Sequence, residues 1–185
     1  MGMALSSNDL LPGEAVEFAK KANSVVKVAE AGLTRFSRDQ LTWMVRMQGS
    51  EAIGGQLHVT NYRLVFCSHF ANRVIGRFSI FLPVISGVRD TSWGIKRQIE
   101  VSTGTHRFTF VVWGIPALMA AIEGLRRHWH PEQAAWLAET ATAEYAKLGE
   151  GLLPRPSQAL RSDMSPIEFV GAMGLMELQD LARGA

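Results

Sequence analysis

The stretch Gly54-Gly55-Gln56-Leu57-His58-Val59-Thr60-Asn61-Tyr62-Arg63-Leu64-Val65-Phe66 decides the fold. Apolar and polar residues alternate on both sides of the polar tripeptide at 60 to 62, and such alternation is typical of β-strands. The stretch therefore predicts a β-hairpin. On its returning strand both faces carry apolar side chains, so we expect another element to cover the outer face.

The same hairpin resembles a known family. Gly-Gly-x-Leu-x-Val-Thr-Asn-x-Arg-Leu-Val-Phe at 54 to 66 is similar to the signature hairpin of the GRAM family. The likeness extends over roughly residues 10 to 128 through further segments, namely Leu-Leu-Pro-Gly-Glu at 10 to 14, Ala22-Asn23, Glu51-Ala52, Ser68-His69, Asn72, the strand around Ile80 and Leu82, and Phe108 to Gly114. The resemblance implies a pleckstrin-homology-like fold and an expected association with membranes. It transfers no ligand-binding residue, because the matching residues are structural, and fold alone does not determine function.

Short segments of apolar and β-branched residues recur between turn residues along the middle of the chain. Besides the hairpin, they predict strands at 41 to 47, 78 to 82, 84 to 89, 96 to 102 and 106 to 113, with a loop at 70 to 77. A helix at 115 to 129 follows, with an apolar stripe of Leu118, Ile122, Leu125 and Trp129. The predicted fold class is α+β. We expect a pleckstrin-homology-like antiparallel sandwich or barrel of about six or seven strands at residues 10 to 130, capped by that helix, with extra helices at both chain ends.

Residues 14 to 31 show a helical spacing. Apolar side chains recur at intervals of three and four, at Ala15, Phe18, Ala22, Val25, Val26 and Ala29, and Gly32 supplies a stop. The pattern favours a helix here, with a strand left open as the alternative. If the segment is a helix, the strand at 41 to 47 must close the sheet in its place.

Composition changes after His130. We expect a second helix at 131 to 148, a linker at 149 to 165, and a final amphipathic helix at 166 to 183 that begins with Ser165-Pro166 and Glu168 as its cap. The last helix has two interpretations. It packs on the surface of its own domain, or it binds a partner through an adaptable face that contains Met173 and Met176.

Catalytic and metal-binding patterns do not emerge from the sequence. His128 and His130 lie two residues apart and point in different directions on a helix, while His58, His69 and His106 fall in separate segments. The single cysteine, Cys67, is expected to act as a small apolar residue. One cysteine cannot form an internal disulfide, which agrees with a reducing compartment. The glycine pair at 54 and 55 lacks the later glycine and lysine of a nucleotide site. We expect a protein that is not an enzyme and needs no cofactor or metal.

Binding is the favoured class of function. The net charge of +2 is small, so a basic site must come from local clustering. The candidate residues of such a basic rim are Arg35, Arg38, Arg46, Arg73, Arg77, Lys96 and Arg97. Arginine suits phosphate because its planar fork donates two hydrogen bonds at once. The rim predicts docking to an anionic membrane surface or a lipid headgroup.

The alternative is a protein-interaction or self-association module that uses a sheet edge beside Pro83 or the C-terminal helices. Nucleic acid is not expected as a partner, because no basic stripe is interleaved with stacking aromatic residues. No apolar run is long enough to span a bilayer, and a cytoplasmic protein with peripheral membrane attachment is expected. Met1-Gly2 fits the loose pattern for acylation at the second residue, with chance as the alternative.

Overall fold

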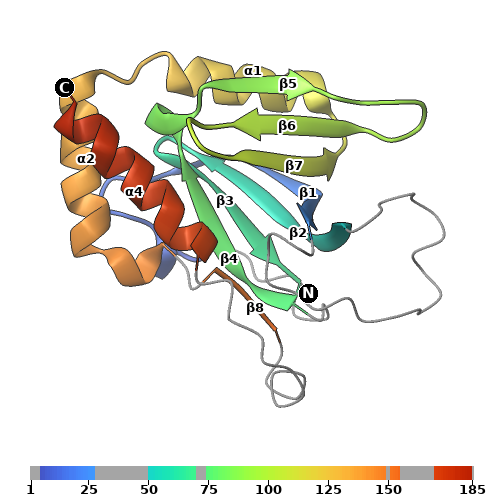
Figure 1. The fold of residues 1–185 in the computed structure, drawn as a ribbon, viewed down its shortest axis with the longest axis horizontal. Coiled ribbons are helices and arrows are strands. Elements are labelled where there is room, and N and C mark those ends of the chain that lie inside the picture. The colour runs from blue at the N-terminus through green and yellow to red at the C-terminus, as the bar shows by residue number, and fades with distance from the viewer. Residues whose placement is uncertain (1–4, 28–49, 70–73, 149–150, 155–168, 185) are drawn as a thin grey trace.

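The chain folds as one antiparallel sheet that bends into two layers, with helices outside both (Figure 1). The computed structural model describes residues 5–27, 50–69, 74–148, 151–154 and 169–184. The strands are β1 (Val16–Lys27), β2 (Ser50–Thr60), β3 (Arg63–Ser68), β4 (Val74–Phe81), β5 (Gly87–Asp90), β6 (Gln98–Ser102), β7 (Arg107–Val112) and β8 (Gly151–Pro154). The α-helices are α1 (Ile115–Arg126), α2 (Pro131–Ala143) and α4 (Phe169–Arg183), with short 3-10 turns at Ser7–Asp9 (η1), Leu82–Val84 (η3) and Tyr145–Lys147 (η4).

The strand order β5-β6-β7-β1-β2-β3-β4-β8 confirms the predicted antiparallel sandwich. β1 pairs with β2 along its whole length but with β7 only from Ala22 to Val25, so the sheet turns at β1 and folds β5–β7 over β1–β4. Leu57, Phe66 and Phe110 share the enclosed core with Ile122 of α1. The helix therefore caps the sandwich, as its apolar stripe predicts.

Residues 16–27 form a strand, so the helix expected at 14 to 31 is wrong where the structure describes the segment. Ala22 and Ser24 of β1 are buried, while their neighbours Lys21 and Asn23 are exposed. Eleven residues of β1 pair with β2, from Val16 opposite Thr60 to Lys27 opposite Ser50, with one register shift between Val16 and Phe18. This long-range pairing outweighs the local helical spacing, because strand stability depends mostly on cross-strand neighbours.

Two further expectations change at segment ends. The loop expected at 70 to 77 ends earlier, because β4 begins at Val74, and the linker expected at 149 to 165 contains β8, which pairs antiparallel with β4. The strand expected at 41 to 47 and the helix cap at Ser165 lie outside the described residues.

Helix α4 packs against β4 and β8, and α2 lies beside α4 (Figure 1). They enclose a second apolar cluster that contains Leu11, Phe81, Ala134, Leu137, Ala138, Ala141, Leu148, Leu175 and Leu178. Helix α4 approaches the sheet closely, since a Cβ on Gly174 would lie 2.8 Å from the Ser79 carbonyl oxygen. The described part of the last helix is thus packed on its own domain. None of the described helices is long and apolar enough to cross a membrane.

Candidate functional site

The predicted basic rim is only partly visible. Arg35, Arg38, Arg46 and Arg73 lie outside the described residues, whereas Arg77, Lys96 and Arg97 are described. Arg77 is on β4 and forms an ion pair with Asp9 of η1, in which each side chain is 20% exposed. Burial opposes ionisation of Asp9, but hydrogen bonds from Ser6 and the Arg77 guanidinium hold the pKa of this carboxyl below its usual value. The charge of Arg77 is therefore already matched by the N-terminal segment.

Lys96 and Arg97 belong to the hairpin that joins β5 to β6. Trp93 and Lys96 exchange two backbone hydrogen bonds of 3.0 Å, which leaves Gly94 and Ile95 as the two turn residues. Gly94 has φ +56°, a left-handed conformation that glycine adopts without a steric penalty. The backbone N–H of Thr91 donates to the Gln98 carbonyl at 2.8 Å, so the hairpin stays paired up to its tip.

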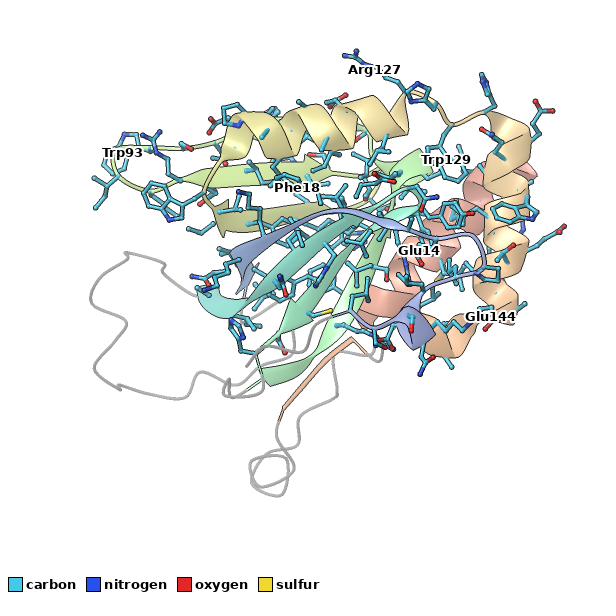
Figure 2. The ribbon with its side chains drawn as sticks, turned by 180° about the vertical axis from the view of Figure 1, so that it is seen from behind. Glu14, Phe18, Trp93, Arg127, Trp129 and Glu144 are labelled. Carbon is cyan, nitrogen blue, oxygen red and sulfur yellow. The ribbon has the colours of Figure 1, made fainter. Side chains whose placement is uncertain are left out.

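Large apolar side chains are exposed to solvent at this tip. Trp93 is 84% exposed and Ile95 is 96% exposed. Figure 2 shows Trp93 at the free end of the hairpin, on the opposite side of the molecule from Trp129 and Glu144. No local sequence pattern reveals this site, because the exposure of a tryptophan depends on the tertiary fold.

Residues from β1 and β7 join the hairpin at the same rim. The Val112 N–H donates to the Arg97 carbonyl at 3.1 Å, which places Trp113, 71% exposed, beside the base of the tip. Lys20 of β1 reaches the same corner, because a Cβ on Gly114 would lie 3.5 Å from its Nζ atom. The Lys20 ammonium also lies 5.3 Å from the centre of the Phe18 ring. We call Lys20, Trp93, Ile95, Lys96, Arg97 and Trp113 the hairpin rim.

Acidic groups near the rim are engaged by neighbouring donors. Asp90 accepts a hydrogen bond of 2.9 Å from the Ser92 N–H. Bonds from Ser92, followed by the charge of Arg97, lower the pKa of Asp90. Glu100 pairs with Arg89 at 2.5 Å, and this hydrogen bond lowers the pKa of Glu100. Asp90 thus offsets part of the Arg97 charge, whereas Glu100 is matched by Arg89.

An aromatic groove lies at the other end of the molecule, where the β2–β3 turn meets α1 and α2. It encloses about 330 Å³ and is lined by Asn61, Tyr62, Leu125, His128, Trp129, Gln133 and Trp136. The Tyr62 ring meets Trp129 edge-on at 5.8 Å between centroids and Trp136 at 5.7 Å. The groove unites three distant segments, so no local sequence signal could have identified it.

The motif residues themselves build an internal ion pair. Arg63 donates to Glu14, to the Ser79 hydroxyl at 2.9 Å and to the Asp9 carbonyl at 2.8 Å. Glu14 also accepts from Thr60 Oγ1 at 2.7 Å. This network joins the Leu-Leu-Pro-Gly-Glu segment to the hairpin, which gives the family-like residues a structural role.

The described residues give little support to a cysteine nucleophile or a metal site. Cys67 is buried, and burial raises the pKa of its thiol to about 11, so the thiolate that would act as a nucleophile is disfavoured. Within the described ranges, no three His, Cys, Asp or Glu side chains are grouped so that they could hold a metal ion.

Comparisons with known proteins add two solved structures to this description. No protein-family model and no curated protein matches the chain. The C-terminal domain of an unknown protein from Leishmania infantum is similar at 18% identity and a TM-score of 0.40, over 60% of this chain and 87% of that one. The Vps36 N-terminal PH domain is similar at 12% identity and a TM-score of 0.41, over 68% of this chain and 93% of that domain.

Proposed function

We propose that the protein is a binding module that attaches to anionic membrane surfaces through the cations of the hairpin rim. The observation that carries this proposal is the convergence of Lys20, Lys96 and Arg97 from β1 and the hairpin at one exposed rim. A lysine or arginine near an anionic leaflet contributes about 1 kcal/mol of attraction. Three such residues, partly offset by Asp90, support reversible attachment.

The rim suits a surface better than an enclosed headgroup pocket. Its cations come from an exposed hairpin and from β1, so they can contact several lipids at once. Arg77 is left out of this proposal because its guanidinium is paired with Asp9. The four arginines outside the described residues, at 35, 38, 46 and 73, stay predictions as further contributors.

Vesicle co-sedimentation tests the proposal. Wild-type protein is expected to bind phosphatidylcholine vesicles that contain phosphatidylserine more tightly than vesicles without it, and added salt should remove that difference by screening. Lys96→Glu with Arg97→Glu should abolish the preference. Arg127→Glu with Arg183→Glu is the matched control, because both arginines are exposed, lie outside the rim, and give the same change in net charge. Equal loss in both double variants would contradict a role of the rim.

A protein-interaction function is the second candidate, and the aromatic groove favours it. Tyrosine and tryptophan are enriched where proteins bind one another. The described part of α4 supports this candidate less, because Leu175 and Leu178 are already buried against the domain. Light scattering of wild type and Trp136→Ala tests self-association through the groove, which predicts a mass above the monomer that falls in the variant.

A further inference from the structure

We infer that the apolar tip of the hairpin rim enters the lipid–water interface, so that the protein also binds bilayers without anionic lipid. The inference rests on the proposed membrane function but concerns a different force. The cations supply attraction to charged lipid, whereas Trp93, Ile95 and Trp113 supply burial of apolar surface that does not depend on lipid charge.

The exposure of these three side chains is the first observation. Each is a large apolar group that leaves most of its surface in water, and all three lie on one rim. The tip is also held in place. Gln98 N–H donates to Ser92 Oγ at 3.1 Å, in addition to the backbone pairing of the hairpin. Apolar groups gathered on a stable surface mark an interaction site.

The order of residues along the hairpin is the second observation. Arg97 pairs with Val112 beside Trp113, and Ile95 lies two residues farther out, in the turn at the end of the hairpin. Ile95 therefore leads, Trp93 and Lys96 lie level with each other behind it, and Arg97 with Trp113 follows. This sequence matches the profile of a bilayer, in which acyl chains are flanked by a headgroup layer where tryptophan, lysine and arginine are favoured.

The charged residues around the tip indicate that the tip binds a lipid surface. Lys96 and Arg97 directly follow the apolar tip, and Lys20 stands beside Trp113. Long basic side chains can extend to phosphate groups while their neighbours are buried more deeply. In this orientation α2, α4 and the aromatic groove face away from the membrane, because they lie at the opposite end of the molecule (Figure 2).

The test uses the full chain with pure phosphatidylcholine vesicles at about 0.5 M salt, where charge attraction is screened. Wild type is expected to bind, and Trp93→Ser with Ile95→Ser should weaken partitioning by about tenfold or more. Tyr145→Ser with Met176→Ser is the matched control, since both residues are exposed and lie outside the rim and the groove.

Quenching of tryptophan fluorescence by lipids brominated in their acyl chains gives a second readout. The amount of fluorescence lost to quenching should fall in Trp93→Phe and stay the same in Trp136→Phe. Binding of the tip variant equal to wild type, or no quenching of Trp93, would overturn the inference.

The outcomes separate the two membrane proposals. Salt-sensitive binding to anionic vesicles that is unaffected by the tip variant would overturn apolar insertion and leave the proposed function standing. Failure of wild type to bind either kind of vesicle would overturn both. A tip variant that changes the mass in light scattering without changing vesicle binding would show that the tip contacts protein, which also contradicts insertion.

Discussion

The Arg63 guanidinium donates from Nε and Nη2 to the two carboxylate oxygens of Glu14, at 2.9 and 3.0 Å, and both side chains are completely buried. The pair joins the N-terminal segment to the β2–β3 hairpin, and Ser79 extends it to β4. Each charge is compensated by the other and by the hydrogen bonds around it. The stability of the fold should therefore depend strongly on the pair remaining intact.

Loss of one partner should be more harmful than loss of both. We expect Arg63→Met or Glu14→Leu to lower the free energy of unfolding by about 3 to 5 kcal/mol, because each leaves an uncompensated buried charge. The double variant should lose less than the sum of the two. Urea denaturation measures all three, and single variants within about 1 kcal/mol of wild type would contradict the predicted dependence.

Gly55 should not tolerate a side chain. A Cβ at this position would lie 2.3 Å from the Cys67 carbonyl oxygen and 2.6 Å from Cζ of Phe66. Gly55→Ala should destabilise the protein by about 1 to 3 kcal/mol or more, because backbone and a core ring must both move. Gly124→Ala is the control, since its Cβ would have no neighbour within 4 Å in an exposed part of α1, and it should stabilise by up to about 1 kcal/mol. Thermal melting of the two variants should show shifts of opposite sign.

His58 should make stability fall in mild acid. It is buried on β2 between Ala19 and Val65, and within the described part of the chain its Nε2 atom has no hydrogen-bond partner. Burial lowers the pKa of His58 below its ordinary value of 6.5. As pH falls below that value, the unfolded chain binds a proton that the folded chain resists, so the free energy of unfolding decreases.

Urea midpoints measured at neutral pH and at successive values below 6.5 check this effect. His58→Gln should reduce the slope of stability against pH, whereas His130→Gln, at an exposed position, should leave it unchanged. A slope that is the same in wild type and His58→Gln would contradict the assignment.

Helix α4 should detach when Gly174 is enlarged. Gly174→Val places a branched side chain where even a Cβ would lie 2.8 Å from the Ser79 carbonyl oxygen. Glu177 also holds the helix to the β6–β7 turn by accepting hydrogen bonds from Thr103 Oγ1 at 2.7 Å and the Thr105 N–H at 3.1 Å. Amide hydrogen exchange should show lost protection across α4 in Gly174→Val and a smaller loss in Glu177→Ala. Met176→Ala, at an exposed position, should change neither protection nor stability.

The parts of the fold that follow from local pattern were predictable. The hairpin at β2–β3 shows its alternation within thirteen residues, and α1 shows its apolar stripe within four turns. In both cases neighbours in the chain determine which side chains share a face. The strand at β1 was not predictable in this way, because Ala22 and Ser24 are small and fill the inward positions without an obvious apolar alternation.

The residues of the candidate site also differ in whether the sequence alone could point to them. Lys96 and Arg97 could be proposed from the sequence because positive charge is a property of the residue alone. Arg77 was assigned to the same rim, yet its role depends on Asp9, which is close only in the folded chain. The sequence alone did not point to Lys20, Trp93, Ile95 and Trp113. Their exposure at one rim depends on how β1 and β7 meet the hairpin, which local pattern does not specify.

The sequence by itself determined the sandwich hairpin, the capping helix and the sign of charge at the β5–β6 turn. Tertiary structure alone decided the strand identity of β1, the burial of Glu14 against Arg63, and the union of apolar and basic side chains at the rim. Local alternation specifies which face a side chain occupies, but the partner it meets depends on contacts between segments far apart in the chain.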